Sequence, residues 1–95
     1  MELIEILKKP TTTIVDVRSE SEFDGGHING ALNIPLHEIP EKLEEFKKMQ
    51  GDVVVYCAAG GRSANAKAYL SQSGIVNVYD AGGIGNISML MMNVK

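Results

Sequence analysis

The chain has 95 residues, a formal net charge of -3 at pH 7 and a hydrophobic fraction of 44%. This length predicts one domain over residues 1–95, with a single core. The small negative charge, without a basic patch, argues against nucleic acid or an acidic membrane surface as a partner. No apolar run approaches a membrane span, and no signal-peptide pattern opens the chain. The one cysteine needs no oxidising compartment, so we expect a cytoplasmic protein, although an exported protein without its leader would look the same.

The first quarter of the chain alternates helix and strand patterns. Residues 2–9 place their apolar side chains on one helical face, and Pro10 ends this helix. Residues 12–17 are rich in β-branched side chains and predict a buried parallel strand. Residues 19–22 have the serine-then-acid pattern of a helix start, and the glycines at 25 and 26 stop that helix.

The alternation continues to the end of the chain. The expected elements are a short strand over 31–35, an amphipathic helix over 40–49, a buried strand over 53–57, a helix after Arg62 that ends near Gly74, a strand over 75–79 and a helix over 87–92. Strands that alternate with helices predict a parallel α/β sandwich.

The only cysteine, Cys57, lies at the turn between the strand over 53–57 and the following helix. Backbone N–H groups and the positive end of a helix favour anions at such a turn, and a thiol there ionises more readily than free cysteine. Cys57 is therefore a candidate nucleophile, although a lone cysteine is also often a buried structural residue. The candidate binding residues of the loop are Ala58, Ala59, Gly60, Gly61, Arg62 and Ser63.

Residues 57–63, Cys-Ala-Ala-Gly-Gly-Arg-Ser, resemble the active-site loop of the rhodanese family of sulfurtransferases, Cys-x-x-Gly-x-Arg-Ser. Three other segments support the resemblance: 15–18 resembles the family's Asp-x-Arg strand end, 26–35 resembles its Gly-His-Ile-x-Gly-Ala-x-Asn-Ile-Pro signature, and 77–83 resembles its last strand and glycine pair. The resemblance implies the rhodanese fold, a three-layer α/β sandwich in which a small parallel sheet is flanked by helices on both faces.

The resemblance also implies a sulfur-transfer reaction. The Cys57 thiolate would take a sulfane sulfur from thiosulfate or a persulfide donor, and a thiol, cyanide or a sulfur-acceptor protein would remove it. Residues 58–61 would supply backbone amides, and Arg62 would orient the oxyanion or persulfide. Ser63 is either the helix N-cap or a further donor to the thiolate. No metal and no other cofactor is expected.

Three further residues are expected to support the site. Asp16 and Arg18 lie at the end of the first strand, where an ion pair between them would tie neighbouring loops. His27 belongs, in the family, to a segment that packs the fold, so we expect a structural role for it. The glycines at 82 and 83 lack dinucleotide-binding spacing and are expected to let their loop approach the Cys57 pocket.

Two departures from the family pattern bear on the substrate. Ile87 stands where the family often has a tryptophan, and Arg62 is the only basic residue of the loop. One guanidinium would hold doubly charged thiosulfate weakly, which favours a persulfide donor. The alternatives are a non-catalytic sulfur-carrier or sensing module loaded by partner proteins, or an enzyme like the related phosphatases and arsenate reductases. The phosphatases have five residues between Cys and Arg, whereas this loop has four, 58–61.

Overall fold

A four-stranded parallel sheet in the order β2-β1-β3-β4 forms the centre of the computed structural model, which describes residues 2–94. The strands are β1 (Thr13–Asp16), β2 (Leu32–Asn33), β3 (Val53–Cys57) and β4 (Val78–Gly83). Because all four are parallel, their carboxyl ends meet at one edge of the sheet. Ligand sites of open α/β sheets form at this edge.

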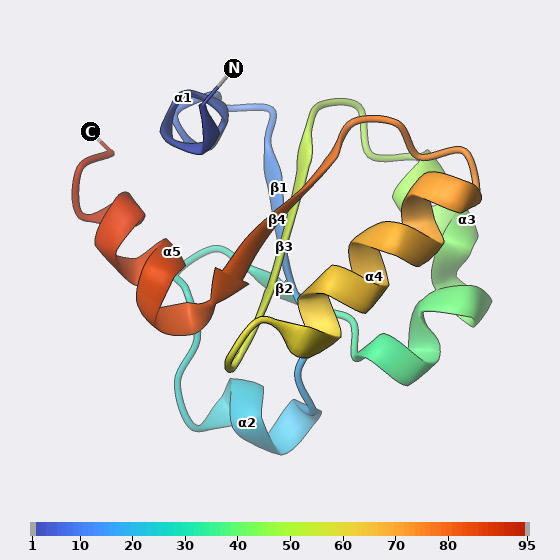
Figure 1. Ribbon diagram of the computed structural model, residues 1–95, viewed down its shortest axis with the longest axis horizontal. Helices are drawn as coiled ribbons and strands as arrows, with labels where there is room; N and C mark the ends of the chain where they lie inside the picture. The colour runs from blue at the N-terminus through green and yellow to red at the C-terminus, as the bar shows by residue number, and fades with distance from the viewer. Residues whose placement is uncertain (1, 95) are drawn as a thin grey trace.

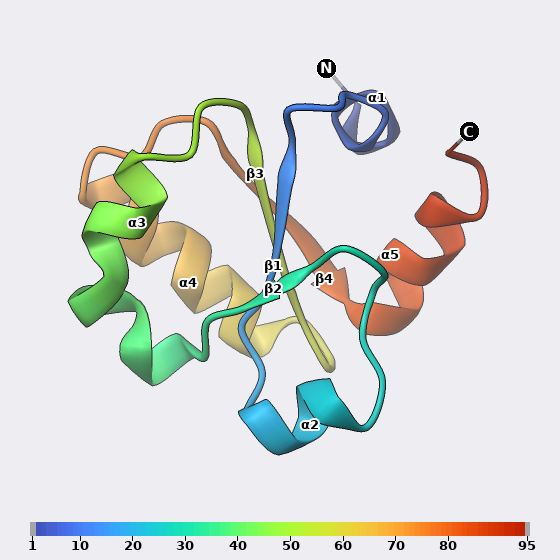
Figure 2. The same cartoon turned by 180° about the vertical axis from the view of Figure 1, so that it is seen from behind.

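Helices cover both faces of the sheet (Figures 1 and 2). The 3-10 helix η1 (Leu36–Lys42), α3 (Leu43–Lys47) and α4 (Gly61–Gln72) lie on one side, and α1 (Leu3–Leu7) and α5 (Ile84–Met91) lie on the other. The short helix α2 (Glu20–Asp24) lies below the carboxyl ends of the strands. The predicted three-layer α/β sandwich is confirmed.

The central strand β3 is buried along its whole length, and its side chains alternate between two apolar clusters. Val53, Val55 and Cys57 belong to the cluster that includes Ala66 and Leu70 of α4. Val54 and Tyr56 belong to the opposite cluster, with Ile6 of α1 and Ile87 of α5. The continuous Val-Val-Val-Tyr-Cys run is therefore the signature of a strand that is covered on both faces.

Four predicted elements have different bounds in the structure. The helix expected over 40–49 is divided into η1 and α3. Pro40 lies inside η1 and has no N–H to donate to an α-helical hydrogen bond. The segment is amphipathic as expected, because Ile39 and Phe46 are buried and Leu43 packs against the same cluster.

The last strand begins at Val78, three residues later than predicted, and runs to Gly83. Ile75 cannot join it because its N–H bonds the carbonyl of Leu70 and closes the end of α4, after Gly74 with a φ of 98°. The strand over 31–35 shrinks to Leu32–Asn33, and the N–H of Ala31 before it donates to the carbonyl of Ile28 in a turn. The last helix starts at Ile84, before the expected 87.

A β-bulge in β4 lies directly beside Cys57. Val55 pairs with Asp80, but Cys57 pairs with Gly83, so β4 holds one extra residue across this interval. Gly82 takes the positive φ of the bulge, 77°, and donates its N–H to the Asp80 carboxylate at 2.8 Å. The bulge brings the backbone of residues 82 and 83 against the cysteine loop.

Candidate active site

The sulfur of Cys57 is held in a ring of hydrogen-bond donors at the start of α4. The Gly60 N–H lies 2.9 Å from Sγ and the Ser63 N–H lies 3.3 Å from it. The Ser63 hydroxyl is 3.4 Å from the same sulfur. Only 1% of Cys57 is exposed, whereas Ala58 and Ala59 beside it are exposed. Cys57 is therefore buried at the base of a loop whose next two residues are exposed.

This surrounding lowers the pKa of the Cys57 thiol below its usual value. Burial acts in the opposite direction, because it disfavours the charged thiolate. Hydrogen bonds from the Ser63 hydroxyl and from the N–H groups of Ser63, Gly60 and Ala59 outweigh burial. The thiolate is the nucleophilic form of cysteine, so the geometry favours reactivity at Sγ.

Ser63 contacts the sulfur and does not cap the helix. The N-cap of α4 is Gly60, in a left-handed conformation with a φ of 107°, and Ser63 stands three residues into the helix. The Ser63 hydroxyl also lies within hydrogen-bond distance of the carbonyls of Gly60, at 3.2 Å, and Gly82, at 3.3 Å, and its one proton serves one of these acceptors at a time. Of the two alternatives that the sequence left open, the structure therefore contradicts the N-cap and places Ser63 beside Sγ.

Gly83 allows the close approach that the sequence predicted. A Cβ at this position would lie 2.7 Å from the carbonyl oxygen of Ala58 and 3.4 Å from the Cα of Ala59. No real Cβ approaches a backbone oxygen so closely, so only glycine fits against the cysteine loop. The bulged end of β4 forms one wall of the loop.

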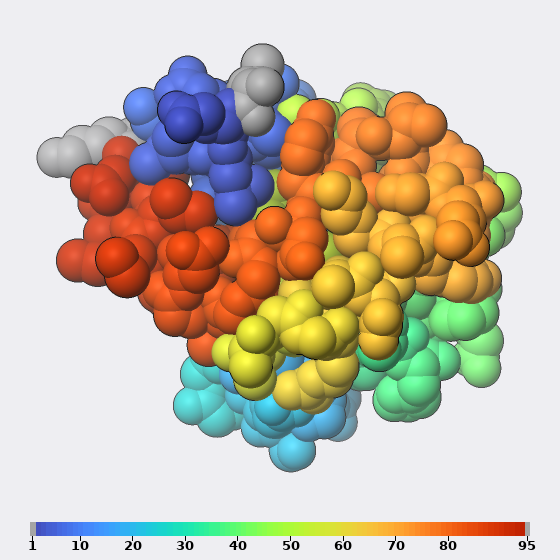
Figure 3. All heavy atoms as spheres, viewed as in Figure 1, coloured from blue at the N-terminus to red at the C-terminus, as the bar shows by residue number. Residues whose placement is uncertain are grey.

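Arg62 does not point at the sulfur in this structure. Its Nη1 and Nη2 atoms donate to the two carboxylate oxygens of Glu22, at 2.7 and 3.0 Å. Figure 3 shows the cysteine loop in yellow beside α2 in blue and cyan on one face of the molecule. Glu22 is a contact that the sequence analysis missed as part of the site. Its only signal was the Ser-x-x-Glu start of α2, which says nothing about a partner 40 residues away.

Asp16 and Arg18 form a buried ion pair at the end of β1. The Arg18 Nη2 atom lies 2.7 Å from Asp16 Oδ2 and 2.6 Å from the Gly26 carbonyl. Asn33, which the sequence analysis did not single out, donates its amide to the carbonyls of Asp16 and Arg18, each at 3.0 Å. These bonds tie the ends of β1 and β2 to the loop after α2, as the ion-pair interpretation expected.

His27 lies away from the sulfur. Its ring is exposed, stacks on Phe23 with centroids 3.7 Å apart and contacts the Phe23 carbonyl through Nδ1 at 2.9 Å.

The residue after His27, Ile28, is buried and donates its N–H to the Tyr56 hydroxyl at 3.0 Å. Desolvation is the main cause that raises the pKa of Tyr56, to about 12, so this hydroxyl stays neutral.

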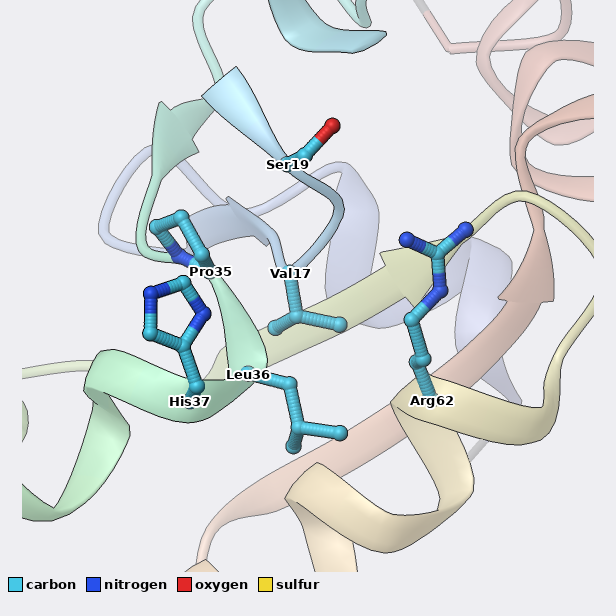
Figure 4. A pocket seen from close by; sticks show the side chains of 6 residues that line it. All are labelled: Val17, Ser19, Pro35, Leu36, His37 and Arg62. Carbon is cyan, nitrogen blue, oxygen red and sulfur yellow. The ribbon is translucent and has the colours of Figure 1, made fainter. Parts of the chain in front are cut away.

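A pocket of about 350 Å³ adjoins the cysteine loop on the side of η1. Figure 4 shows Arg62 on one side of it and Pro35 and His37 on the other, with Val17 and Leu36 between them. The pocket gives a mostly apolar approach to the start of α4. Within residues 2–94, no group of three or more His, Cys, Asp or Glu side chains gathers at metal-binding distance.

The order of strands, the cysteine loop and the glycine contact agree with a known family. The family model for the rhodanese-like domain matches residues 1–88. The chain belongs to the rhodanese-like family. The resemblance inferred from the four motifs is thereby confirmed.

The names of the rhodanese-like relatives of this chain state different activities. Thiosulfate sulfurtransferase PspE of Escherichia coli (strain K12) is 41% identical over 76 residues, which cover 79% of this chain and 73% of PspE. A tRNA uridine(34) hydroxylase of Photorhabdus laumondii is 33% identical over 84 residues, 83% of this chain but 24% of the hydroxylase. The solved structure of a rhodanese with anions from E. coli superposes with a TM-score of 0.74 at 37% identity, covering 81% of this chain and 92% of that one.

Proposed function

We propose that this rhodanese-like protein is a sulfurtransferase that carries a sulfane sulfur as a persulfide on Cys57. The observation that carries the proposal is the set of donors from Gly60 and Ser63 around Sγ. Such donors stabilise a thiolate before the reaction and a terminal persulfide anion after it. The likeness to a relative named thiosulfate sulfurtransferase supports the same chemistry.

The first half-reaction transfers one sulfur atom to the enzyme. The Cys57 thiolate attacks the outer sulfur of thiosulfate, an S–S bond forms at Cys57, and the donor S–S bond breaks to release sulfite with its electron pair. A persulfide donor reacts in the same way and leaves as a thiolate. The exposed residues Ala58 and Ala59 and the N–H of Gly60 border the position of the transferred sulfur.

The second half-reaction returns the enzyme to its starting state. Cyanide or an acceptor thiolate attacks the outer sulfur of the persulfide, and the electron pair of the broken S–S bond returns to Sγ of Cys57. The chain holds a single cysteine, so the acceptor is a second molecule, either a small thiol or a protein. Asp16, Arg18 and the segment after His27 support the loop and take no part in these bonds.

The expected compartment and domain organisation fit this reaction. We place it in the cytoplasm, where a lone thiol stays reduced, and assign residues 1–95 to one domain. Neither a metal nor another cofactor enters the two steps. In the described part of the chain, residues 2–94, no helix has the length and apolar character to cross a bilayer.

Intact mass spectrometry of the reduced protein tests the proposal. The protein is incubated with thiosulfate and, separately, with glutathione persulfide. We expect a gain of one sulfur atom that cyanide reverses, because an activated thiolate attacks sulfane sulfur. The Cys57→Ala variant is the control and should gain nothing. If neither donor adds sulfur to the native protein, the proposal is wrong.

Sulfur carriage without fast turnover is the second candidate. Met89 and Met92, at the end of the chain, are 67% and 79% exposed. Exposed methionines are typical of adaptable docking surfaces, so they favour a carrier that docks onto a partner protein. A carrier would gain sulfur in a single loading step but produce thiocyanate slowly with excess thiosulfate and cyanide. Steady-state thiocyanate formation therefore separates the carrier from the enzyme.

A further inference from the structure

Glu22 binds the one charged side chain of the cysteine loop in a bidentate ion pair. Arg62 directs two parallel N–H groups at the two carboxylate oxygens, at 2.7 and 3.0 Å. This fork geometry is the strongest arrangement of a guanidinium and a carboxylate. The pair joins α2 to the first turn of α4, beside the cysteine loop.

The carboxylate of Glu22 is fixed from its other side as well. Its Oε1 atom accepts hydrogen bonds from the N–H of Ser19 at 3.1 Å and from the Ser19 hydroxyl at 3.0 Å. These contacts belong to the capping box that starts α2. The contacts with Ser19 therefore orient the Glu22 carboxylate independently of Arg62. The hydrogen bond from Arg62 is the main cause that lowers the pKa of Glu22 to about 2, so the carboxylate is charged at neutral pH.

The second arginine near the site is paired too. Arg18 donates to Asp16 and to the Gly26 carbonyl. Residues 57–63 contain no charged side chain besides Arg62. Each of the two guanidinium groups is thus neutralised by its own carboxylate. A doubly charged donor meets backbone amides but little net positive charge.

We propose that Glu22 is a specificity-determining residue: by neutralising Arg62 it disfavours doubly charged donors such as thiosulfate and directs the site to organic persulfides, whose reacting end carries one charge at most. This inference rests on the proposed sulfur transfer. It goes further by naming the residue that selects between donors. Glu22 acts through Arg62, so it is a positioning residue and touches no reacting atom.

The Glu22→Gln variant tests the inference with little damage to the fold. Glutamine also serves at this position of a capping box, so α2 keeps its start while the negative charge is lost. We expect the KM for thiosulfate to fall about five- to tenfold, since an unpaired guanidinium then faces a dianion. The kcat should change by less than about twofold, and the KM for 2-mercaptoethanol persulfide should change far less than that for thiosulfate.

Asp24→Asn is the matched control. Asp24 is exposed on the same helix, and its substitution removes the same charge without touching the Arg62 pair. The control should leave the KM for thiosulfate within about twofold of the native value. An equal fall of KM in both variants would mean a general charge effect, and the inference would be wrong. An unchanged KM in Glu22→Gln, with native protein that transfers sulfur normally, would also overturn it.

Sulfate binding separates this inference from the proposed function. Sulfate is a doubly charged anion that donates no sulfur, and its binding is measured by how far it slows alkylation of Cys57 by iodoacetamide. Protection should require about five- to tenfold less sulfate in Glu22→Gln than in the native protein. If neither thiosulfate nor a persulfide loads the native protein, the function fails, and the sulfate result still decides whether Glu22 controls anion charge. Equal protection in the two proteins contradicts the inference.

Discussion

The Oγ of Ser63 lies 3.4 Å from the Sγ of Cys57, and the same hydroxyl reaches the carbonyls of Gly60 and Gly82. Ser63→Ala removes this hydroxyl and leaves the Ser63 N–H in place. We expect the pKa of Cys57 to rise, because the side chain of Ser63 is the largest of the causes that lower it. At a pH below that pKa, alkylation of Cys57 by iodoacetamide should slow about three- to tenfold.

The pH dependence of alkylation is the measurement that checks the Ser63 prediction. The pKa of the native thiol should lie below that of an ordinary cysteine, and the profile of Ser63→Ala should move to higher pH. Ser71→Ala, an exposed serine of the same helix, is the control and should keep the native profile. Identical profiles in all three proteins would show that the hydroxyl has no influence on the thiolate.

Gly83→Ala should disturb the cysteine loop by steric contact alone. The φ of Gly83 is -83°, which any residue adopts, but its Cβ would lie 2.7 Å from the Ala58 carbonyl oxygen. We expect a loss of about 1–3 kcal/mol in the free energy of unfolding, together with slower alkylation of Cys57. Urea unfolding and iodoacetamide kinetics measure the two effects.

Gly85→Ala is the matched control for the glycine contact. Gly85 lies in α5 with open space around its Cβ position, and alanine is the better helix former. This variant should keep the native alkylation rate and gain up to about 1 kcal/mol of stability. A Gly83→Ala protein that behaves like Gly85→Ala would refute the close approach of β4 to the loop.

Asp16→Ala should be strongly destabilising. Asp16 is fully buried, and its loss would leave the Arg18 guanidinium in the interior without its carboxylate. Breaking a buried ion pair by removing one partner costs about 3–5 kcal/mol. Urea unfolding checks the value, with Glu5→Gln as reference, because the exposed pair of Glu5 and Lys8 should contribute less than about 1 kcal/mol. A loss below that reference would contradict the structural role of Asp16.

The ion pair of Glu22 and Arg62 should contribute stability that depends on pH. The Arg62 hydrogen bond lowers the pKa of Glu22 from 4.5 to about 2 in the folded protein. A carboxyl whose pKa falls on folding stabilises the fold at a pH above its unfolded value and stops doing so as the pH falls through its folded value. The difference in unfolding midpoint between native protein and Glu22→Gln should therefore be constant above pH 4.5 and shrink between pH 4.5 and about 2. A difference that is flat across this range would show that the pair does not hold in solution.

The alternation of strands and helices was predictable because the apolar patterns are local. Val53 to Cys57 is a continuous apolar run that begins with three β-branched valines, and such a run is typical of a parallel strand covered on both faces. The position of Cys57 at the start of a helix, and hence the donors around its sulfur, follows from the same local order of strand, glycines and alanines. The glycine pair at 82 and 83 was likewise assigned correctly to a close approach.

The partners of the polar side chains depended on the tertiary structure. The sequence analysis assigned Arg62 to the substrate, but its ion pair with Glu22, which stands 40 residues earlier in the chain, was not predictable. The sequence allowed Ser63 to be the helix N-cap or a donor to the sulfur, and the structure shows that Gly60, in a left-handed conformation, is the N-cap. Ile75 fits the apolar pattern of the last strand, but in the structure its N–H donates to the carbonyl of Leu70 at the end of α4, so it lies outside the strand.

The amino-acid sequence by itself determined the layers of this protein, its family and the candidate nucleophile, because periodicity and turn chemistry act between residues close in the chain. The tertiary structure alone decided where the charges are neutralised. Contacts such as that of Arg62 with Glu22 join elements that are brought together only when the helices pack around the sheet. The chemical character of Cys57 was therefore readable from its neighbours in sequence, whereas the charge that a substrate meets there depends on a neighbour in space.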